Sequence, residues 1–72
     1  MPCIDMVETG RRIREMRIAS GMTVKESQEI FGFGSQNTIY KWQKGESLPT
    51  IDNFVVLAKI FATTIDAIIA VK

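Results

Sequence analysis

Residues 21–49 read GMTVKESQEIFGFGSQNTIYKWQKGESLP, and this stretch decides the fold. A helix is expected to begin near Thr23, because Thr23 and Glu26 have the spacing of a capping box, in which each side chain bonds a backbone N–H at the helix start. The helix should end at Gly32, since glycine adopts positive φ without a steric penalty. We expect Gly34 to adopt positive φ as well, with the phenylalanine between the two glycines buried between helices. The stretch therefore opens with a short helix and a glycine-rich turn.

A second short helix follows this turn. Ser35 is expected to cap it, and Gly45 to end it after about ten residues. Within it, Ile39 and Trp42 lie three residues apart and so share the face that packs inward. The opposite face is polar and consists of Gln36, Asn37, Tyr40, Lys41 and Lys44.

Two short helices joined in this way form a helix-turn-helix, a unit that places the start of its second helix in the major groove of DNA. Glutamine and asparagine bond adenine bidentately, and lysine donates to guanine or to phosphate. Any solvated helix can carry these residue types. Here, however, an amide pair, Gln36 and Asn37, occupies the first turn of the second helix, where base-reading residues belong. The polar face is therefore the candidate DNA-binding face.

Three segments carry a family resemblance: GRRIREMR at 10–17, SGMT at 20–23 and IYKWQKGESLPTIDN at 39–53. With them, the chain resembles the Cro/cI-type helix-turn-helix family, also called the xenobiotic response element (XRE) or lambda-repressor-like family, over about residues 7 to 70. The resemblance implies an all-α fold of five helices in a compact bundle, with the helix-turn-helix formed by helices 2 and 3. It further implies a small bacterial or phage regulator that binds double-stranded operator DNA, usually as a dimer that blocks transcription.

The resemblance also implies roles for individual residues. The family commonly has a phosphate-gripping glutamine directly after the cap of helix 2, where this chain has Val24, so Thr23 or Lys25 is expected to take that role. An arginine–glutamate pair frequent in the family would here be a hydrogen bond between Arg17 and Gln43. Residues that match base-contacting positions are Gln36, Asn37 and Lys41. Residues expected to contact or flank the DNA backbone are Thr23, Lys25, Ser35, Thr38, Tyr40 and Lys44.

Three further helices are expected outside the central stretch. The first runs from about Asp5 or Met6 to Ser20, with Asp5 and Glu8 as a cap-like pair. Gly10 inside it costs about 1 kcal/mol relative to alanine, which suggests close packing against a neighbour. The fourth begins after a Thr50 cap and ends near residue 62, and the fifth spans about 64–71.

The charge of the chain is nearly balanced, with a formal net charge of +1. A strong non-specific nucleic-acid binder is more basic than this, so the distribution of charge matters more than the total. Helix 1 is rich in arginine, and we expect Arg11 or Arg12 to bind a phosphate. The alternative is that these arginines pair with Glu8 or Glu15 on the same helix.

Helices 4 and 5 are too apolar for helices with only one buried face. Part of this apolar surface will fill the core, and the remainder is expected to form a homodimer contact that sets two reader helices about 34 Å apart. The expected dimer residues are Ile65, Ile68, Ile69 and Val71. The competing hypothesis is a protein-interaction module, such as an antitoxin or adaptor, that uses this apolar surface instead of reading DNA.

Other functions are disfavoured by composition. The sequence has no histidine and one cysteine, Cys3, so it offers neither a zinc site nor a histidine-based catalytic arrangement. We expect no enzyme activity, no cofactor, no small-molecule ligand and no membrane span. At 72 residues the chain is expected to be a single domain over 1–72, in the reducing cytoplasm.

Overall fold

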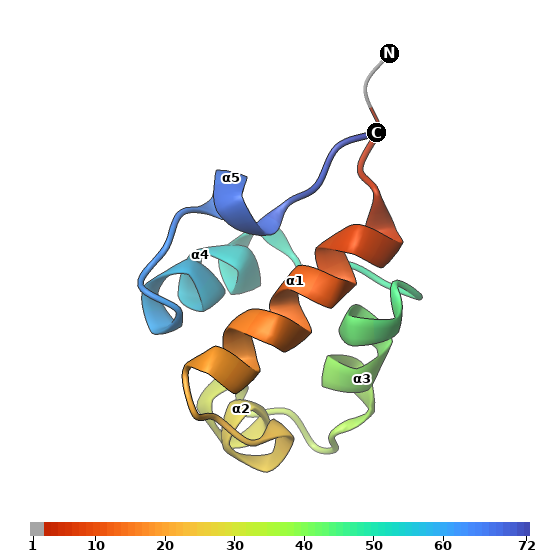
Figure 1. Cartoon of the computed structure of the whole chain (residues 1–72). Helices are drawn as coiled ribbons and strands as arrows, with labels where there is room; N and C mark the ends of the chain where they lie inside the picture. Colours follow the sequence, from red (N-terminus) through yellow and green to blue (C-terminus); the bar gives the residue numbers. More distant parts are fainter. Residues whose placement is uncertain (1–2) are drawn as a thin grey trace.

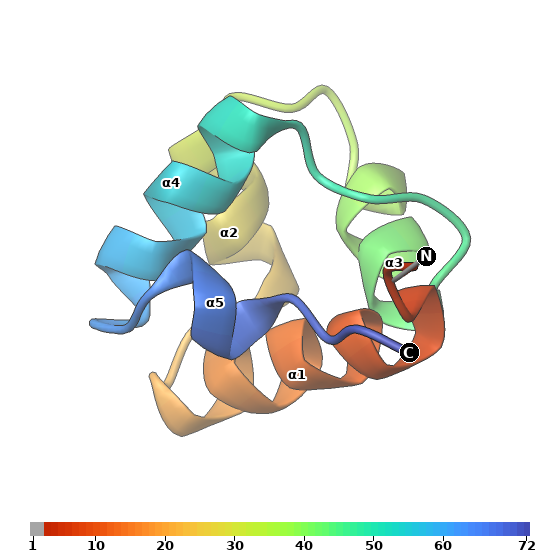
Figure 2. The ribbon, with the colours of Figure 1, turned by 90° about the horizontal axis from the view of Figure 1, so that it is seen from above.

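The computed structural model describes residues 3–72, and its regular structure is helical throughout except for one antiparallel bridge between Ile4 and Val71. The helices are α1 (Met6–Ala19), α2 (Val24–Phe31), α3 (Asn37–Lys44), α4 (Ile51–Ile60) and α5 (Ile65–Ile68). α1 crosses the middle of the molecule, with α3 on one side of it and α4 on the other (Figure 1). Seen from above, α1 runs along one edge of the molecule, with α3 near one of its ends and α5 between α1 and α4 (Figure 2). The predicted five-helix, all-α fold is confirmed.

Local capping starts most of these helices. The Asp5 side chain accepts a hydrogen bond from the Glu8 amide at 3.1 Å and caps α1. The predicted capping box begins α2, since Thr23 and Glu26 exchange side-chain-to-backbone bonds of 3.0 Å in both directions. Thr50 caps α4 through the amide of residue 53. These starts follow from polar side chains that satisfy amides left over by the first helical turn.

One core joins all five helices. Its buried members are Ile13, Val24, Ile39, Trp42, Phe54, Leu57 and Ile68. The predicted inward face of α3 is confirmed, because Ile39 is 2% exposed and Trp42 is 3% exposed. α3 therefore has one fixed orientation, with its polar face turned outward.

The turn between α2 and α3 differs from the expectation in two details. Gly32 is left-handed with φ of 70°, as expected, but Gly34 does not adopt positive φ. α3 begins at Asn37 with Gln36 in the N-cap position, one residue later than a Ser35 cap predicts. The Ser35 hydroxyl still accepts from the Asn37 amide at 3.3 Å, and Gln36 already has helical dihedral angles.

The last helix is shorter than the expected range of 64–71. α5 ends at Ile68, and the following residues are extended because they pair with the other end of the chain. The Ala70 amide donates to the Thr9 hydroxyl at 2.9 Å, and the Ala70 carbonyl accepts from the Asp5 amide at 2.8 Å. The Lys72 amide donates to the Cys3 carbonyl at 2.8 Å. None of the helices within residues 3–72 has the length and apolar character needed to cross a membrane.

Candidate nucleic-acid interface

Three aromatic rings fix α2 against α3. The rings of Phe31 and Phe33 are stacked with centroids 5.3 Å apart, and both meet Trp42 edge-on, at 5.4 and 5.6 Å. Aromatic pairs in these geometries contribute about 0.5–1.5 kcal/mol beyond their buried area. Phe33 is half-buried against the core, so the turn residue helps to set the position of α3.

The backbone of the turn is held by one glutamine. Gln28 donates from Nε2 to the carbonyl of Phe33 at 3.0 Å, and the amide of Phe33 donates back to the carbonyl of Gln28 at 3.1 Å. The Gly32 amide donates to the carbonyl of Glu29 at 3.2 Å. These bonds occupy the carbonyls at the end of α2 and give the turn a defined path into α3.

α1 braces the other side of α3. Arg17 donates from Nε to Oε1 of Gln43 at 2.9 Å, as predicted, and from Nη1 to the Met22 carbonyl at 2.7 Å. Gly10 lies so close to α3 that a Cβ there would collide with the carbonyl oxygen of Trp42 and would lie 2.8 Å from that of Gln43. The expectation that Gly10 permits close packing is confirmed.

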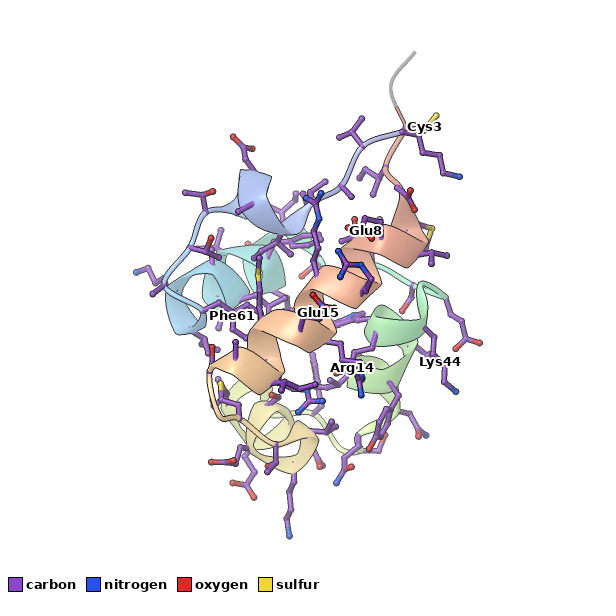
Figure 3. The ribbon with its side chains drawn as sticks, in the orientation of Figure 1. Cys3, Glu8, Arg14, Glu15, Lys44 and Phe61 are labelled. Atoms are coloured by element: carbon purple, nitrogen blue, oxygen red, sulfur yellow. The ribbon has the colours of Figure 1, made fainter. Side chains whose placement is uncertain are left out.

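With α3 held in this way, its polar face is available to a partner. Asn37 and Lys41 are exposed and Gln36 is half-buried, and none of these three side chains bonds to residues 3–72. Three residues of α3 have an expected backbone role: Tyr40 is 43% exposed, Lys44 is exposed, and Thr38 is half-buried. Lys44 extends from α3 away from the bundle (Figure 3). The base-contacting and backbone roles of these residues remain predictions.

The start of α2 offers a second set of groups. Val24 is buried in the core and cannot reach a phosphate. Thr23 and Lys25 are exposed, but the Thr23 hydroxyl already accepts from the Glu26 amide. The Thr23 amide in turn donates to the Glu26 carboxylate, which lowers the pKa of Glu26. Lys25 is thus the cation at the start of α2. Ser35 provides an exposed hydroxyl just before α3.

Arg11 and Arg12 adopt the alternative weighed for them, pairing with acids of α1. Arg11 donates to both carboxylate oxygens of Glu8 at 2.6 Å and pairs with Glu15 at 2.7 Å. Arg12 donates to Glu8 at 3.2 Å and reaches the carbonyls of Ala67 and residue 69 at 3.3 and 3.4 Å. The hydrogen bond from Arg11 is the chief cause of the lowered pKa of Glu8, about 2. These bonds direct Arg12 toward α5 and Arg11 toward Glu8 and Glu15, and the phosphate-binding role of either arginine remains a prediction.

Arg14, which the sequence pattern did not single out, is exposed and makes no ion pair or hydrogen bond within residues 3–72. A signal for this was present, because no acidic residue lies three or four positions from it along α1. In Figure 3 it lies on the side of α1 nearer to α3.

The expected dimer residues are not equally accessible. Ile68 is 0% exposed and belongs to the core, so it presents no surface to a partner. Ile65 and Ile69 are half-buried against the core, and Val71 is 60% exposed. The shortening of α5 explains the difference, because Val71 leaves the helix and enters the extended segment at the edge of the molecule.

Comparisons with known proteins agree with this geometry. The fold is similar to that of the restriction-modification controller protein C.AhdI from Aeromonas hydrophila, with a TM-score of 0.75 and 22% identity over 89% of this chain and 96% of that one. It is also similar to the DNA-binding domain of BldD, with a TM-score of 0.73 and 14% identity over 90% of this chain and 93% of that one. No curated protein matches the sequence significantly. The helix-turn-helix family, however, matches residues 13–68, which is most of the chain. The chain therefore belongs to the XRE/Cro-cI-like helix-turn-helix family, whose fold and activity are those of DNA-binding transcription regulators rather than enzymes.

Proposed function

We propose that this protein is a cytoplasmic repressor that binds operator DNA as a homodimer and reads its sequence with α3. The observation that carries the proposal is the polar face of α3, where the side chains of Gln36, Asn37 and Lys41 have no hydrogen-bond partner within residues 3–72. In this proposal Gln36 and Asn37 bond base edges, and Lys41 donates to guanine. The braces from Phe33 and Arg17 support it, because a reader helix must be held rigidly to discriminate between bases.

The test is selection of binding sites from a random duplex pool with purified protein, followed by affinity measurements on the selected site. Enrichment of a palindrome is expected, with half-sites about one helical turn, 34 Å, apart. Gln36→Ala and Lys41→Ala should each remove discrimination at defined base pairs, worth about 1–3 kcal/mol per contact. Lys59→Ala is the matched control, because Lys59 is an exposed lysine of α4, on the other side of α1 from α3. Absence of any enriched motif would contradict sequence reading.

Repression is tested separately from DNA binding, with a reporter gene. A reporter promoter that carries the selected site should be silenced by the protein, and Lys41→Ala should restore its expression while Lys59→Ala does not. Increased transcription from the same promoter would contradict the repressor role and leave the DNA-reading role intact.

The second candidate function is a protein-interaction module. It is favoured by the outer face of α4, where Ile51 is 71% exposed and Val55, one turn later, is 42% exposed. Exposed apolar side chains that gather on one face mark protein contacts in soluble proteins. This function predicts that Ile51→Asp abolishes biological activity while Gln36→Ala and Lys41→Ala preserve it. The opposite pattern is expected for the proposed repressor.

A further inference from the structure

Arg14 differs from the other three arginines of α1 in having no side-chain partner within residues 3–72. Arg11 and Arg12 are bonded to Glu8, and Arg17 is bonded to Gln43. Arg14 is exposed and has no such partner within residues 3–72. The positions three and four residues away along α1 hold glycine, two arginines and isoleucine, so the helix itself supplies no neutralising carboxylate.

The rotation of α1 places Arg14 on its flank toward α3. Gly10, one turn earlier, packs on the Trp42 and Gln43 carbonyls, and Arg17, one turn later, bonds the Gln43 side chain. Residues at positions i, i+4 and i+7 lie on one helical stripe, so Arg14 falls between two contacts with α3. The stick view agrees, with Arg14 on the α3 side of α1 (Figure 3).

The surface beside Arg14 is basic and carries few acids. α3 contains Lys41 and Lys44, both exposed, and no aspartate or glutamate. Gln43 is neutral, so the positive charge of Arg17 is not cancelled by its partner in α3. Two helices packed against each other, α1 and α3, therefore each contribute exposed positive charge, Arg14 from α1 and Lys41 and Lys44 from α3.

We infer that Arg14 binds a phosphate of the DNA strand that borders the groove entered by α3, and so extends the contact surface from α3 to α1. The inference rests on the proposed function, because it assumes that α3 approaches DNA. A guanidinium on a helix beside the reader helix is suited to this role, since its planar donors match two phosphate oxygens. The contact fixes the protein on the duplex and carries no sequence information of its own.

The experiment compares wild type, Arg14→Gln, Arg14→Lys and Lys59→Gln in binding to the selected duplex and to an unrelated duplex over a range of salt concentrations. Arg14→Gln should lower affinity for both duplexes by a similar factor, roughly five- to tenfold near 0.1 M salt, and should reduce the slope of log K against log salt by about 0.9. Arg14→Lys should retain most of the slope because it retains the charge. Lys59→Gln should match wild type. Thermal unfolding monitored by circular dichroism should be alike for all four proteins, because neither substituted side chain has a partner to lose.

The outcomes separate this inference from the proposed function. If wild type selects a sequence but Arg14→Gln behaves like Lys59→Gln, the phosphate contact is wrong and the reader function stands. If wild type selects no sequence yet Arg14→Gln still lowers the salt slope, sequence reading is wrong and the phosphate contact stands. Loss of discrimination between the two duplexes in Arg14→Gln would mean a base contact and would overturn the phosphate assignment. Absence of any DNA binding by wild type would overturn both.

Discussion

The Nε atom of Arg17 donates to Oε1 of Gln43 at 2.9 Å, so a side chain of α1 holds the helix that carries the candidate base-reading residues. The same guanidinium donates to the Met22 carbonyl at 2.7 Å, just before α2 begins. One arginine thus connects α1, the entry to α2 and α3. Because the partner in α3 is an amide, the fold does not bear the desolvation cost of a second charge at this position.

Arg17→Ala should lower the free energy of unfolding by about 2 kcal/mol, because it leaves the Met22 carbonyl and the Gln43 amide without their charged donor. Chemical denaturation measures this loss. Arg14→Ala on the same helix is the control and should leave stability unchanged, since Arg14 has no hydrogen bond within residues 3–72. Equal stability of the two variants would show that the brace contributes nothing.

Gly10→Ala should destabilise the protein although alanine is the better helix former. The propensity gain is about 1 kcal/mol, whereas the new Cβ meets backbone carbonyls of Trp42 and Gln43, which cannot rotate away. Overpacking of this kind costs about 1–3 kcal/mol, so after the propensity gain we expect a net loss of about 1 kcal/mol, with weakened DNA binding. Gly34→Ala is the matched control, because a Cβ at Gly34 meets nothing within 4 Å and its φ is not positive. An unchanged Gly10→Ala protein would refute the close approach.

The ion pairs of Glu8 predict a specific acid response. Its pKa is lowered from 4.5 to about 2, chiefly by the hydrogen bond from Arg11. A carboxyl group whose pKa is lower in the folded state stabilises the fold fully above its ordinary pKa, and that stabilisation is lost as the pH falls toward the folded pKa. Wild type should therefore lose stability between about pH 4.5 and pH 2 through this group, and Glu8→Gln should lose less over that window.

Melting temperatures measured across this pH range test the prediction. The effect should be small, because Glu8 and Arg11 are in contact with solvent and exposed ion pairs are weak. Glu46→Gln, which removes an exposed carboxylate that has no ion pair within residues 3–72, is the control and should follow wild type. Parallel curves for Glu8→Gln and wild type would contradict the role assigned to Glu8.

Two exposed apolar sites allow the proposed dimer to be located. Val71→Asp and Ile51→Asp each place a charge on a surface side chain, 60% and 71% exposed, so both variants should fold. Sedimentation equilibrium should show a dimer for wild type and a monomer for Val71→Asp if the contact uses the C-terminal segment. A monomer only for Ile51→Asp would contradict a dimer contact through the C-terminal segment. Ile68→Asp is unsuitable for this test, because a charge at a fully buried position unfolds the core.

Features set by neighbouring residues could be predicted from the sequence. The capping box of Thr23 and Glu26 and the left-handed end at Gly32 involve residues within one helical turn of each other. The inward orientation of Ile39 and Trp42 follows from helical periodicity alone. Together these features decide which face of α3 points outward, so the sequence alone locates the candidate site.

Features set by distant residues could not be predicted. α5 ends at Ile68 because the residues that follow it form hydrogen bonds with Thr9, Asp5 and Cys3. The apolar pattern of residues 64–71 does not indicate these partners. The absence of an acidic neighbour of Arg14 can be read from the sequence, but the helix that each arginine of α1 faces is a tertiary property. Arg12 turns toward α5 and Arg14 lies toward α3 because of how α1 is rotated in the bundle, a rotation that composition does not encode.

The pairing of the first and last described residues also has a topological consequence. The Cys3 carbonyl accepts from the Lys72 amide, so the two ends of the described segment lie side by side. Such a chain can be treated as a ring: a short linker from residue 72 to residue 3 would preserve the fold, and the ring could be reopened at exposed Glu46 between α3 and α4. A circularly permuted protein of this kind would begin just after α3 and would end with α3. The reader helix would then no longer be joined to α4 by the chain.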